Sequence, residues 1–353
     1  MATDTTTDVQ RLNDVLRPAA PPRVMQDLYT EDQHERMLGV IRDRGPWPTI
    51  GAHHFDTVEE LVATSNGGSA ERVDFTLDDI ASAHFRGFFA ENSVVYYPEI
   101  HDCFYNERFL GLAKDYWGGA AYARPTMMLF NFCGPHRSGL NSHIDAVTFR
   151  GIRIENSPVW LQNVMGRSGL FTEHLVKMAQ VITWWYLGEN GTFTYWPDGP
   201  LGDPQRLEHP LWNKGVVVQN EAMFHRGDPV GRPDERDVPG LKHRSLIGYD
   251  AEHGDWSVTT DGEVIRRYRP DEMRLLVHWN AEVYSDLDEV KKNMDHSDDL
   301  THDIVFDRLL ADMRARGVKV AEPSDPLHDQ DFIRALIAAY SITPAKDWAR
   351  PAA

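Results

Sequence analysis

The sequence predicts an α+β protein with a mainly β core, in the form of a sandwich, jelly roll or barrel, flanked by helices. Three observations support this fold class. The central part of the chain is rich in short segments of β-branched and aromatic residues, bounded by Gly and Pro turns. Both ends show apolar residues spaced three or four apart, the periodicity of an amphipathic helix. Strands and helices do not alternate along the chain, which argues against a doubly wound parallel sheet.

The N-terminal part divides into a leader and a helical flank. Residues 1–22 are polar and end in Ala-Ala-Pro-Pro, so we expect a flexible leader there. Residues 23–353 are expected to form a single domain that opens with a helical flank over 23–120. Within this flank, the segments 28–45 and 102–119 carry helical periodicity and end on Gly, which commonly terminates a helix.

The β core is predicted over about 121–283, and C-terminal helices are predicted over 284–345. Met127–Phe132 is typical of a buried strand, because it is apolar and lies between a Pro and a Gly. Other segments rich in Val, Thr and aromatic residues predict further strands at 180–187, 191–196, 215–225 and 243–250. Helical periodicity returns in three segments, at 286–295, 303–317 and 329–341.

Composition excludes several classes of protein. The 353 residues include 36 Lys and Arg and 54 Asp and Glu, so the net charge is −18. That balance argues against nucleic-acid binding and against docking on anionic membranes, and it favours a neutral or cationic small-molecule substrate. The two cysteines exclude a disulfide framework and a Cys-based zinc site. With no signal-peptide pattern and no membrane-length apolar run, we expect a cytoplasmic protein, monomeric or homodimeric.

One H-x-D triplet stands out as a candidate metal site. The triplet also occurs at His54 and His296, so its presence alone is weak evidence. His143-Ile144-Asp145 differs because it follows a predicted strand, and residues i and i+2 of extended chain share a face. His225 ends a later strand and supplies a third ligand. Two imidazoles and one carboxylate form the facial triad of non-haem Fe(II) oxygenases, which leaves three coordination positions open.

A buried arginine would complete the site if the cosubstrate is a keto diacid. Guanidinium binds a carboxylate through two parallel hydrogen bonds and keeps its charge when buried. Arg244 opens the predicted strand after the loop that follows His225, and it shares a face with a small Gly, so it is the preferred anchor. Arg232 and Arg236 lie in that loop and remain alternatives.

The region from about 120 to 250 resembles the phytanoyl-CoA hydroxylase-like branch of the Fe(II)/2-oxoglutarate-dependent dioxygenases. The motifs that carry the resemblance follow in order: His143-Ile144-Asp145, turns at Glu189–Gly191 and Trp196–Gly199, a strand leading to His225, and Arg244 opening the last strand. The resemblance implies a double-stranded β-helix, or jelly-roll, core. It also implies Fe(II) held by the first three side chains, 2-oxoglutarate anchored by the arginine, and O2 as the oxidant. Asp145 argues against a halogenase, because those relatives lack this carboxylate.

Four further residues are candidates for ligand contacts. Asn131 and Gln219 are expected to hydrogen-bond the cofactor carboxylate, and Phe149 and Trp196 are expected to line the substrate pocket. The resemblance implies oxidation of an unactivated C–H bond, by hydroxylation or oxidative ring closure. The acidic net charge, and the substrates that some members of the resembled family oxidise, favour a small polar natural product, such as an aminoglycoside or another sugar-derived antibiotic intermediate. The alternatives are a cupin-like metal-dependent hydrolase or isomerase and a non-catalytic jelly-roll binding protein.

Overall fold

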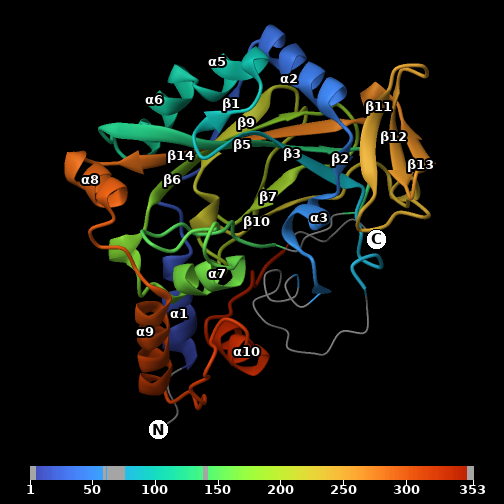
Figure 1. The fold of residues 1–353 in the computed structure, drawn as a ribbon. Coiled ribbons are helices and arrows are strands. Elements are labelled where there is room, and N and C mark those ends of the chain that lie inside the picture. Colours follow the sequence, from blue (N-terminus) through green and yellow to red (C-terminus); the bar gives the residue numbers. More distant parts are fainter. Residues whose placement is uncertain (1–4, 59–60, 62–75, 138–141, 348–353) are drawn as a thin grey trace.

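The structure, a computed structural model, describes residues 5–58, 61, 76–137 and 142–347. Within these residues the protein is mainly antiparallel β structure with flanking helices, which confirms the predicted class (Figure 1). In this part of the chain the central sheet has seven antiparallel strands, in the spatial order β1 (Arg23–Gln26), β9 (Lys214–Val218), β6 (Lys177–Trp185), β14 (Arg274–Tyr284), β5 (Tyr122–Cys133), β3 (His84–Glu91) and β4 (Val94–Val95).

A smaller sheet packs against one face of the central sheet. In the described residues it has the order β10 (His225–Gly227), β7 (Phe193–Tyr195) and β8 (Gln205–Arg206). Phe193 and Tyr195 share a buried apolar cluster with Ile182 and Trp184 of β6. This cluster forms the core between the two sheets.

The residues of β6 divide between the two faces of the central sheet, as the alternation of a strand requires. Ile182 and Trp184 point into the core between the sheets. Val181 and Trp185 belong to a different buried cluster on the opposite face. Both faces of β6 are therefore buried, which explains why its sequence is apolar throughout instead of alternating with polar residues.

Two helices cover the outer face of the central sheet, α2 (Glu31–Arg44) and α6 (Glu107–Tyr116) (Figure 1). Phe109 of α6 meets Trp279 of β14 edge to face, with ring centroids 5.5 Å apart. Thr30 caps α2, because its side chain accepts a hydrogen bond from the backbone of the third helical residue. Two short helices complete this region, α3 (Ile50–His54) and α5 (His101–Phe104).

A second apolar core lies beneath the small sheet, away from α2 and α6. It joins α1 (Thr5–Val15), α7 (Val159–Ser168), α9 (His302–Ala315) and α10 (Gln330–Ala339). The flexible leader predicted over 1–22 is wrong for the described part of that range, because α1 forms there. Leu12 and Leu16 are buried in this core. The helix α8 (Leu287–Asp295) lies beside the end of β14 (Figure 1).

The flank predicted as helical over 23–120 also contributes strands, which is a second correction. β1 pairs with β9 at one edge of the central sheet, and β3 and β4 form the other edge next to β5. β1 and β4 have only four and two residues, so their patterns alone are weak strand signals. Pairing with a strand distant in sequence stabilises β1 and β3.

Three strands of a third sheet are inserted between the end of β10 and the start of β14, and the early strand β2 (Trp47–Pro48) pairs with one of them. In the described residues the order of this sheet is β13 (Glu263–Tyr268), β12 (Asp255–Thr260), β11 (Leu246–Asp250) and β2. This insertion stands at one side of the molecule (Figure 1). The strand opening after Arg244 therefore belongs to the third sheet, and the last strand of the central sheet is β14.

Replacing Leu16 by alanine should lower the free energy of unfolding by about 2–4 kcal/mol, because the side chain is buried and its loss leaves a cavity. Val9 lies on α1, the helix that ends one residue before Leu16, and 41% of its surface is exposed, so Val9→Ala is the matched control and should change little. Urea unfolding of both variants measures the difference. Equal unfolding midpoints for Leu16→Ala and the parent chain would mean that the N-terminal helix is not packed on the protein.

Candidate metal centre

The backbone brings the two histidines of the predicted triad together. His143 and His225 form an antiparallel bridge in which each N–H donates to the other's carbonyl, at 3.0 and 2.9 Å. Directly opposed residues of an antiparallel pair place their side chains on the same face. Asp145 is two residues beyond His143, and its N–H donates to the carbonyl of Asn220 at 3.2 Å. Backbone hydrogen bonds therefore fix the main chain at all three residues, so that their side chains start from neighbouring positions.

The ligand atoms of the three residues converge on one point. The Oδ1 atom of Asp145 lies 3.5 Å from Nε2 of His225 and 4.0 Å from Nε2 of His143. One ligand atom from each residue lies within 4.8 Å of the other two. Two ligand atoms that lie about 2.0–2.2 Å from one ion at right angles are about 3 Å apart, so the three side chains would need only small movements to hold an ion together. The side chains of His143 and Asp145 are 24% and 27% exposed, so the open side of the triad is reachable by a ligand.

The hydrogen bonds of His225 and the charges around Asp145 suit metal binding. Nδ1 of His225 faces the carbonyl of Met223 at 3.1 Å, so this nitrogen carries the proton and Nε2 keeps its lone pair for the ion. Burial opposes ionisation of Asp145, but His225 outweighs it through charge and a hydrogen bond, with further help from His278 and His143. The pKa of Asp145 is therefore lowered, and its carboxylate is available as a ligand.

Behind the triad, one amide connects the partly exposed carboxylate of Asp145 with the buried carboxyl group of Glu221. Nε2 of Gln180 donates to Oδ2 of Asp145 and to Oε1 of Glu221, both at 3.0 Å. The Oε1 atom of Gln180 accepts from the backbone N–H of Asn220 at 2.8 Å. Burial, followed by the negative charge of Asp145, raises the pKa of Glu221 to about 8. Glu221 is therefore a neutral acid at mildly acidic pH.

The raised pKa of Glu221 predicts how stability depends on pH in the metal-free protein. Because the folded-state pKa of about 8 exceeds the usual 4.5, the stabilisation by neutral Glu221 is fully present below that usual value. It is lost as the pH rises toward the folded-state pKa. Glu221→Gln keeps a neutral side chain of the same shape, so its free energy of unfolding should fall less over this interval. Urea unfolding across the pH series tests this, and identical slopes would contradict a neutral Glu221.

A buried arginine faces the space between the two sheets, but it is not the predicted one. Arg274 opens β14 and is 3% exposed. Within the described residues, its Nε and Nη2 atoms are buried without a hydrogen-bond partner. The indole Nε1 of Trp184 is also buried and unpartnered, and the Arg274 guanidinium lies 6.0 Å from the Trp184 ring centroid. Buried donors without acceptors are costly, so they indicate a place for an anionic ligand.

Strand geometry places Arg274 and the triad along the same face of the central sheet. Arg274 and His278 are four residues apart on β14 and therefore point to the same side. His278 pairs in register with Ile182, which faces the core between the sheets. Gln180 lies two residues before Ile182 on the same face of β6, and its amide donates to Asp145 at 3.0 Å, so the triad lies against this face. Burial lowers the pKa of His278 to about 4, and the charge of Asp145 opposes that lowering. The distance along β14 from His278 to Arg274 is about 13 Å, at about 3.3 Å per residue.

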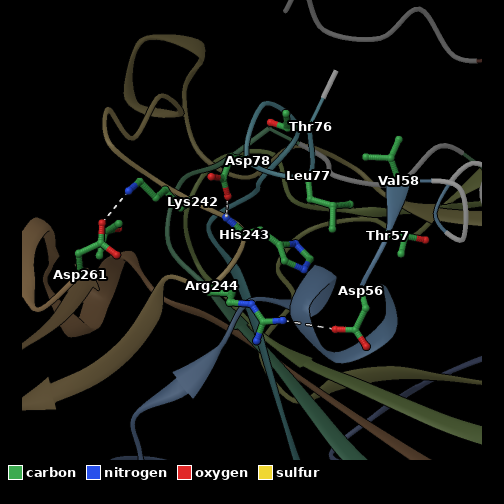
Figure 2. Close-up of a pocket in the computed structure, with 11 residues that line it drawn as sticks. Asp56, Thr57, Val58, Thr76, Leu77, Asp78, Lys242, His243, Arg244 and Asp261 are labelled. Carbon is green, nitrogen blue, oxygen red and sulfur yellow. Dashed lines mark hydrogen bonds and ion pairs between the residues drawn. The ribbon is translucent and has the colours of Figure 1, made fainter. Parts of the chain in front are cut away.

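Arg244, the preferred anchor from sequence, lies elsewhere. Its side chain is 80% exposed and its Nη2 is 3.4 Å from Oδ1 of Asp56. Figure 2 shows both residues at a surface pocket of about 630 Å³, where Lys242 pairs with Asp261. This position differs from the buried one expected from the sequence, because the strand after Arg244 belongs to the third sheet.

The other two arginine candidates both bond residues of their own loop. Arg232 is exposed and pairs with Glu235 at 2.7 Å. Arg236 is buried, but its Nε and Nη2 both donate to the carbonyl of Gly231, at 3.2 and 2.8 Å. Arg236 therefore stabilises its own loop.

The two predicted polar contacts differ in position. Asn131 is buried on β5, and its Oδ1 accepts from Nε of Arg86 at 2.8 Å. Because Asn131 pairs with Leu276 of β14, it lies on the same face as Arg274. Gln219 instead uses its Oε1 to accept from the backbone N–H of Ala19 at 3.0 Å. That bond fixes the segment after α1, a structural contact that the expectation for Gln219 did not include.

Phe149 and Trp196 are both packed in the second apolar core. Phe149 is buried and lies 6.2 Å from Phe171 between ring centroids. Trp196 is fully buried, and its indole N–H donates to the carbonyl of Lys346 at 2.8 Å. Both contacts are structural, and the substrate role expected for these aromatic residues has no support in the described residues.

Comparisons with known proteins give remote likenesses in structure. No protein-family model and no curated protein match the chain. An oxidoreductase of the 2OG-Fe(II) oxygenase family from Burkholderia pseudomallei matches with a TM-score of 0.38 and 10% identity, over 79% of this chain and 92% of that one. A Pseudomonas putida prolyl-4-hydroxylase gives 0.35 and 10%, over 79% and 99%. Apo HygX from Streptomyces hygroscopicus gives 0.32 and 9%, over 78% and 85%.

At such TM-scores these likenesses carry no functional argument, so the assignment of function rests on the residues of the site. Within the described residues, none of the helices is both long and apolar enough to cross a membrane.

Proposed function

We propose that this protein is an Fe(II)- and 2-oxoglutarate-dependent oxygenase with a double-stranded β-helix core. The observation that carries the proposal is the triad of His143, Asp145 and His225, on the same inner face as an arginine with buried, unpartnered donors. Two neutral imidazoles and one carboxylate form the facial donor set of non-haem Fe(II) oxygenases. A hydrolytic metal site has no use for Arg274, whereas a keto diacid needs such a partner for its distal carboxylate.

The order of the strands supports the jelly-roll form of this core. From β5 onward the chain passes from the central sheet to the small sheet and back several times. β5, β6, β9 and β14 lie in the central sheet, while the His143 bridge, β7, β8 and β10 lie in the small one. Two sheets built by such crossings form a jelly roll. The motif order that resembles the phytanoyl-CoA hydroxylase-like branch is kept, with the anchor moved from Arg244 to Arg274.

The chain's own residues would bind and orient the reactants. His143, Asp145 and His225 would hold Fe(II) on one face, while Arg274 would bind the distal carboxylate of 2-oxoglutarate, with Trp184 Nε1 as a further donor. When bound, the iron and 2-oxoglutarate would use O2 to oxidise a substrate C–H bond, with release of succinate and CO2. The buried side of the triad, at His225, keeps bulk water from the site, and its partly exposed side, at His143 and Asp145, admits the substrate.

The proposed substrate is a small polar natural product, such as an aminoglycoside or another sugar-derived antibiotic intermediate, which is hydroxylated or closed into a ring. The net charge of −18 supports this class, because the summed field attracts cationic molecules. We propose that the protein acts on this substrate in the cytoplasm as a monomer or homodimer, without nucleic-acid or membrane partners.

The proposed reaction can be tested without knowing the substrate, by measuring the conversion of 2-oxoglutarate to succinate that is not coupled to substrate oxidation. Protein loaded with Fe(II) should convert 2-oxoglutarate to succinate slowly in the presence of O2, and omission of either iron or O2 should stop it. Zn(II)-loaded protein is the control and should form none. Tight retention of zinc or manganese with no succinate under any condition would instead favour the metal-dependent hydrolase or isomerase.

A further inference from the structure

The metal ligand Asp145 is held by a side chain that is itself fixed in the middle of the central sheet. Gln180 lies on β6, where its backbone pairs with Asn280 of β14 on one side and with Val218 of β9 on the other. Its side chain is buried, at 1% exposure. A residue paired on both sides cannot shift without breaking two ladders of hydrogen bonds, so its side chain starts from a rigid position.

The orientation of the Gln180 amide is determined by its three contacts. The amide oxygen faces the backbone N–H of Asn220 at 2.8 Å, and oxygen is the only end of the amide that can accept this bond. The amide nitrogen must then face the other way, toward Oδ2 of Asp145 and Oε1 of Glu221. Its two hydrogens match these two acceptors. A flipped amide would place its oxygen against the Asp145 carboxylate and its NH2 group against a backbone donor.

We propose that Gln180 is a positioning residue that makes Asp145 a one-oxygen ligand, by holding Oδ2 away from the ion so that only Oδ1 faces the two imidazoles. The proposal rests on the metal centre of the proposed function but not on its oxidation chemistry. Oδ1 is the oxygen 3.5 Å from Nε2 of His225, whereas Oδ2 is the oxygen bonded to Gln180. A carboxylate that binds through both oxygens would take two coordination positions. One-oxygen binding leaves three of six positions for exogenous ligands.

Glu221 favours this arrangement while it is neutral, which is its state below its raised pKa of about 8. The acid shares the Gln180 amide with Asp145 and is buried, and within the described residues its Oε2 has no hydrogen-bond partner. A second negative charge there would compete with Asp145 for the amide and repel it. Neutral Glu221 accepts a hydrogen bond from one N–H of the Gln180 amide. The charged carboxylate of Asp145 accepts the stronger, charge-assisted bond from the other N–H.

The test uses Co(II) as a spectroscopic probe, because its visible absorption reports coordination and needs no oxygen chemistry. We expect Gln180→Leu to weaken Co(II) binding by about 10- to 100-fold, the usual effect of losing a partner that orients a metal ligand, and to change the visible spectrum. Gln180→Glu replaces the amide nitrogen with oxygen while keeping the shape, so it remains informative if the leucine variant does not fold. It should change affinity and spectrum in the same direction.

A second buried glutamine provides the matched control. Gln162 lies on α7 outside the site, is equally buried, and donates to the carbonyl of Ser157 at 3.0 Å. Gln162→Leu should leave the Co(II) affinity and spectrum unchanged. Parent-like affinity and spectrum in both Gln180 variants would overturn the positioning role, as would equal weakening by Gln162→Leu. Failure of the parent protein itself to bind Co(II) would instead refute the metal centre on which the inference rests.

Discussion

His225→Ala is expected to weaken Fe(II) binding by more than a hundredfold and to abolish succinate formation from 2-oxoglutarate. The variant removes one of three protein ligands, a larger loss than the about 10- to 100-fold that follows removal of an outer partner. It also removes the ring whose Nδ1 is tied to the carbonyl of Met223. Fe(II) affinity is measured anaerobically by competition with a chromophoric chelator.

The control for this prediction is a histidine of similar local bonding outside the triad. His209 is exposed, and its Nε2 lies 2.7 Å from the carbonyl of Asn190. His209→Ala should retain parent-like Fe(II) affinity. If His225→Ala also bound Fe(II) as tightly as the parent, the triad could not be the metal centre.

Arg274→Leu should raise the KM for 2-oxoglutarate about a hundredfold and leave Fe(II) affinity nearly unchanged. The proposed contact consists of charge-assisted hydrogen bonds to a carboxylate, worth about 1.5–3 kcal/mol each. Loss of about 3 kcal/mol in total corresponds to roughly a hundredfold, at about 1.4 kcal/mol per factor of ten. Succinate formation at varied 2-oxoglutarate concentration gives the KM.

Arg244→Leu decides between the two anchors, because Arg244 was the sequence-based choice and lies exposed beside Asp56. This variant should keep the parent KM for 2-oxoglutarate. A large rise in KM for Arg244→Leu together with none for Arg274→Leu would return the anchor to the inserted sheet and contradict the position proposed for the keto acid.

The triad could be predicted from sequence because its determinants are local. The H-x-D spacing puts His143 and Asp145 on one face of extended chain, and His225 follows an apolar strand at a strand-to-loop boundary. The structure brings these three side chains together by a two-residue bridge and one further backbone bond. None of this depends on which distant strands pair.

The proposed anchor, Arg274, could not be predicted from sequence, because its position depends on long-range strand pairing. In the family pattern that the sequence resembles, an arginine opens the last strand of the core. Arg274 fits this pattern in the structure, but Arg244 comes earlier in the sequence and also opens a predicted strand. Only the pairing of β11 with β12 and β2, rather than with the central sheet, shows that residues 246–268 are an insertion. A clue was present in the sequence, since the segment after 270 contains a longer apolar strand that also begins with arginine.

The residues behind the triad were missed for a different reason. Gln180 begins an apolar segment that is typical of a core strand, and nothing in its neighbours indicates a carboxylate on the facing sheet. Glu221 lies in a short turn before His225 and resembles an ordinary surface acid in sequence. Their connection to Asp145 arises only when β6 and the 220–222 turn meet in three dimensions.

The most direct test of the central claim is an anaerobic titration of the metal-free protein with Fe(II) and 2-oxoglutarate, followed by visible absorption. The account predicts a weak charge-transfer band that requires both additions, is lost in His225→Ala, and needs far more 2-oxoglutarate in Arg274→Leu. It also predicts that O2 discharges the band with formation of succinate. Absence of the band in the parent protein at saturating Fe(II) and 2-oxoglutarate would contradict an iron–keto-acid site.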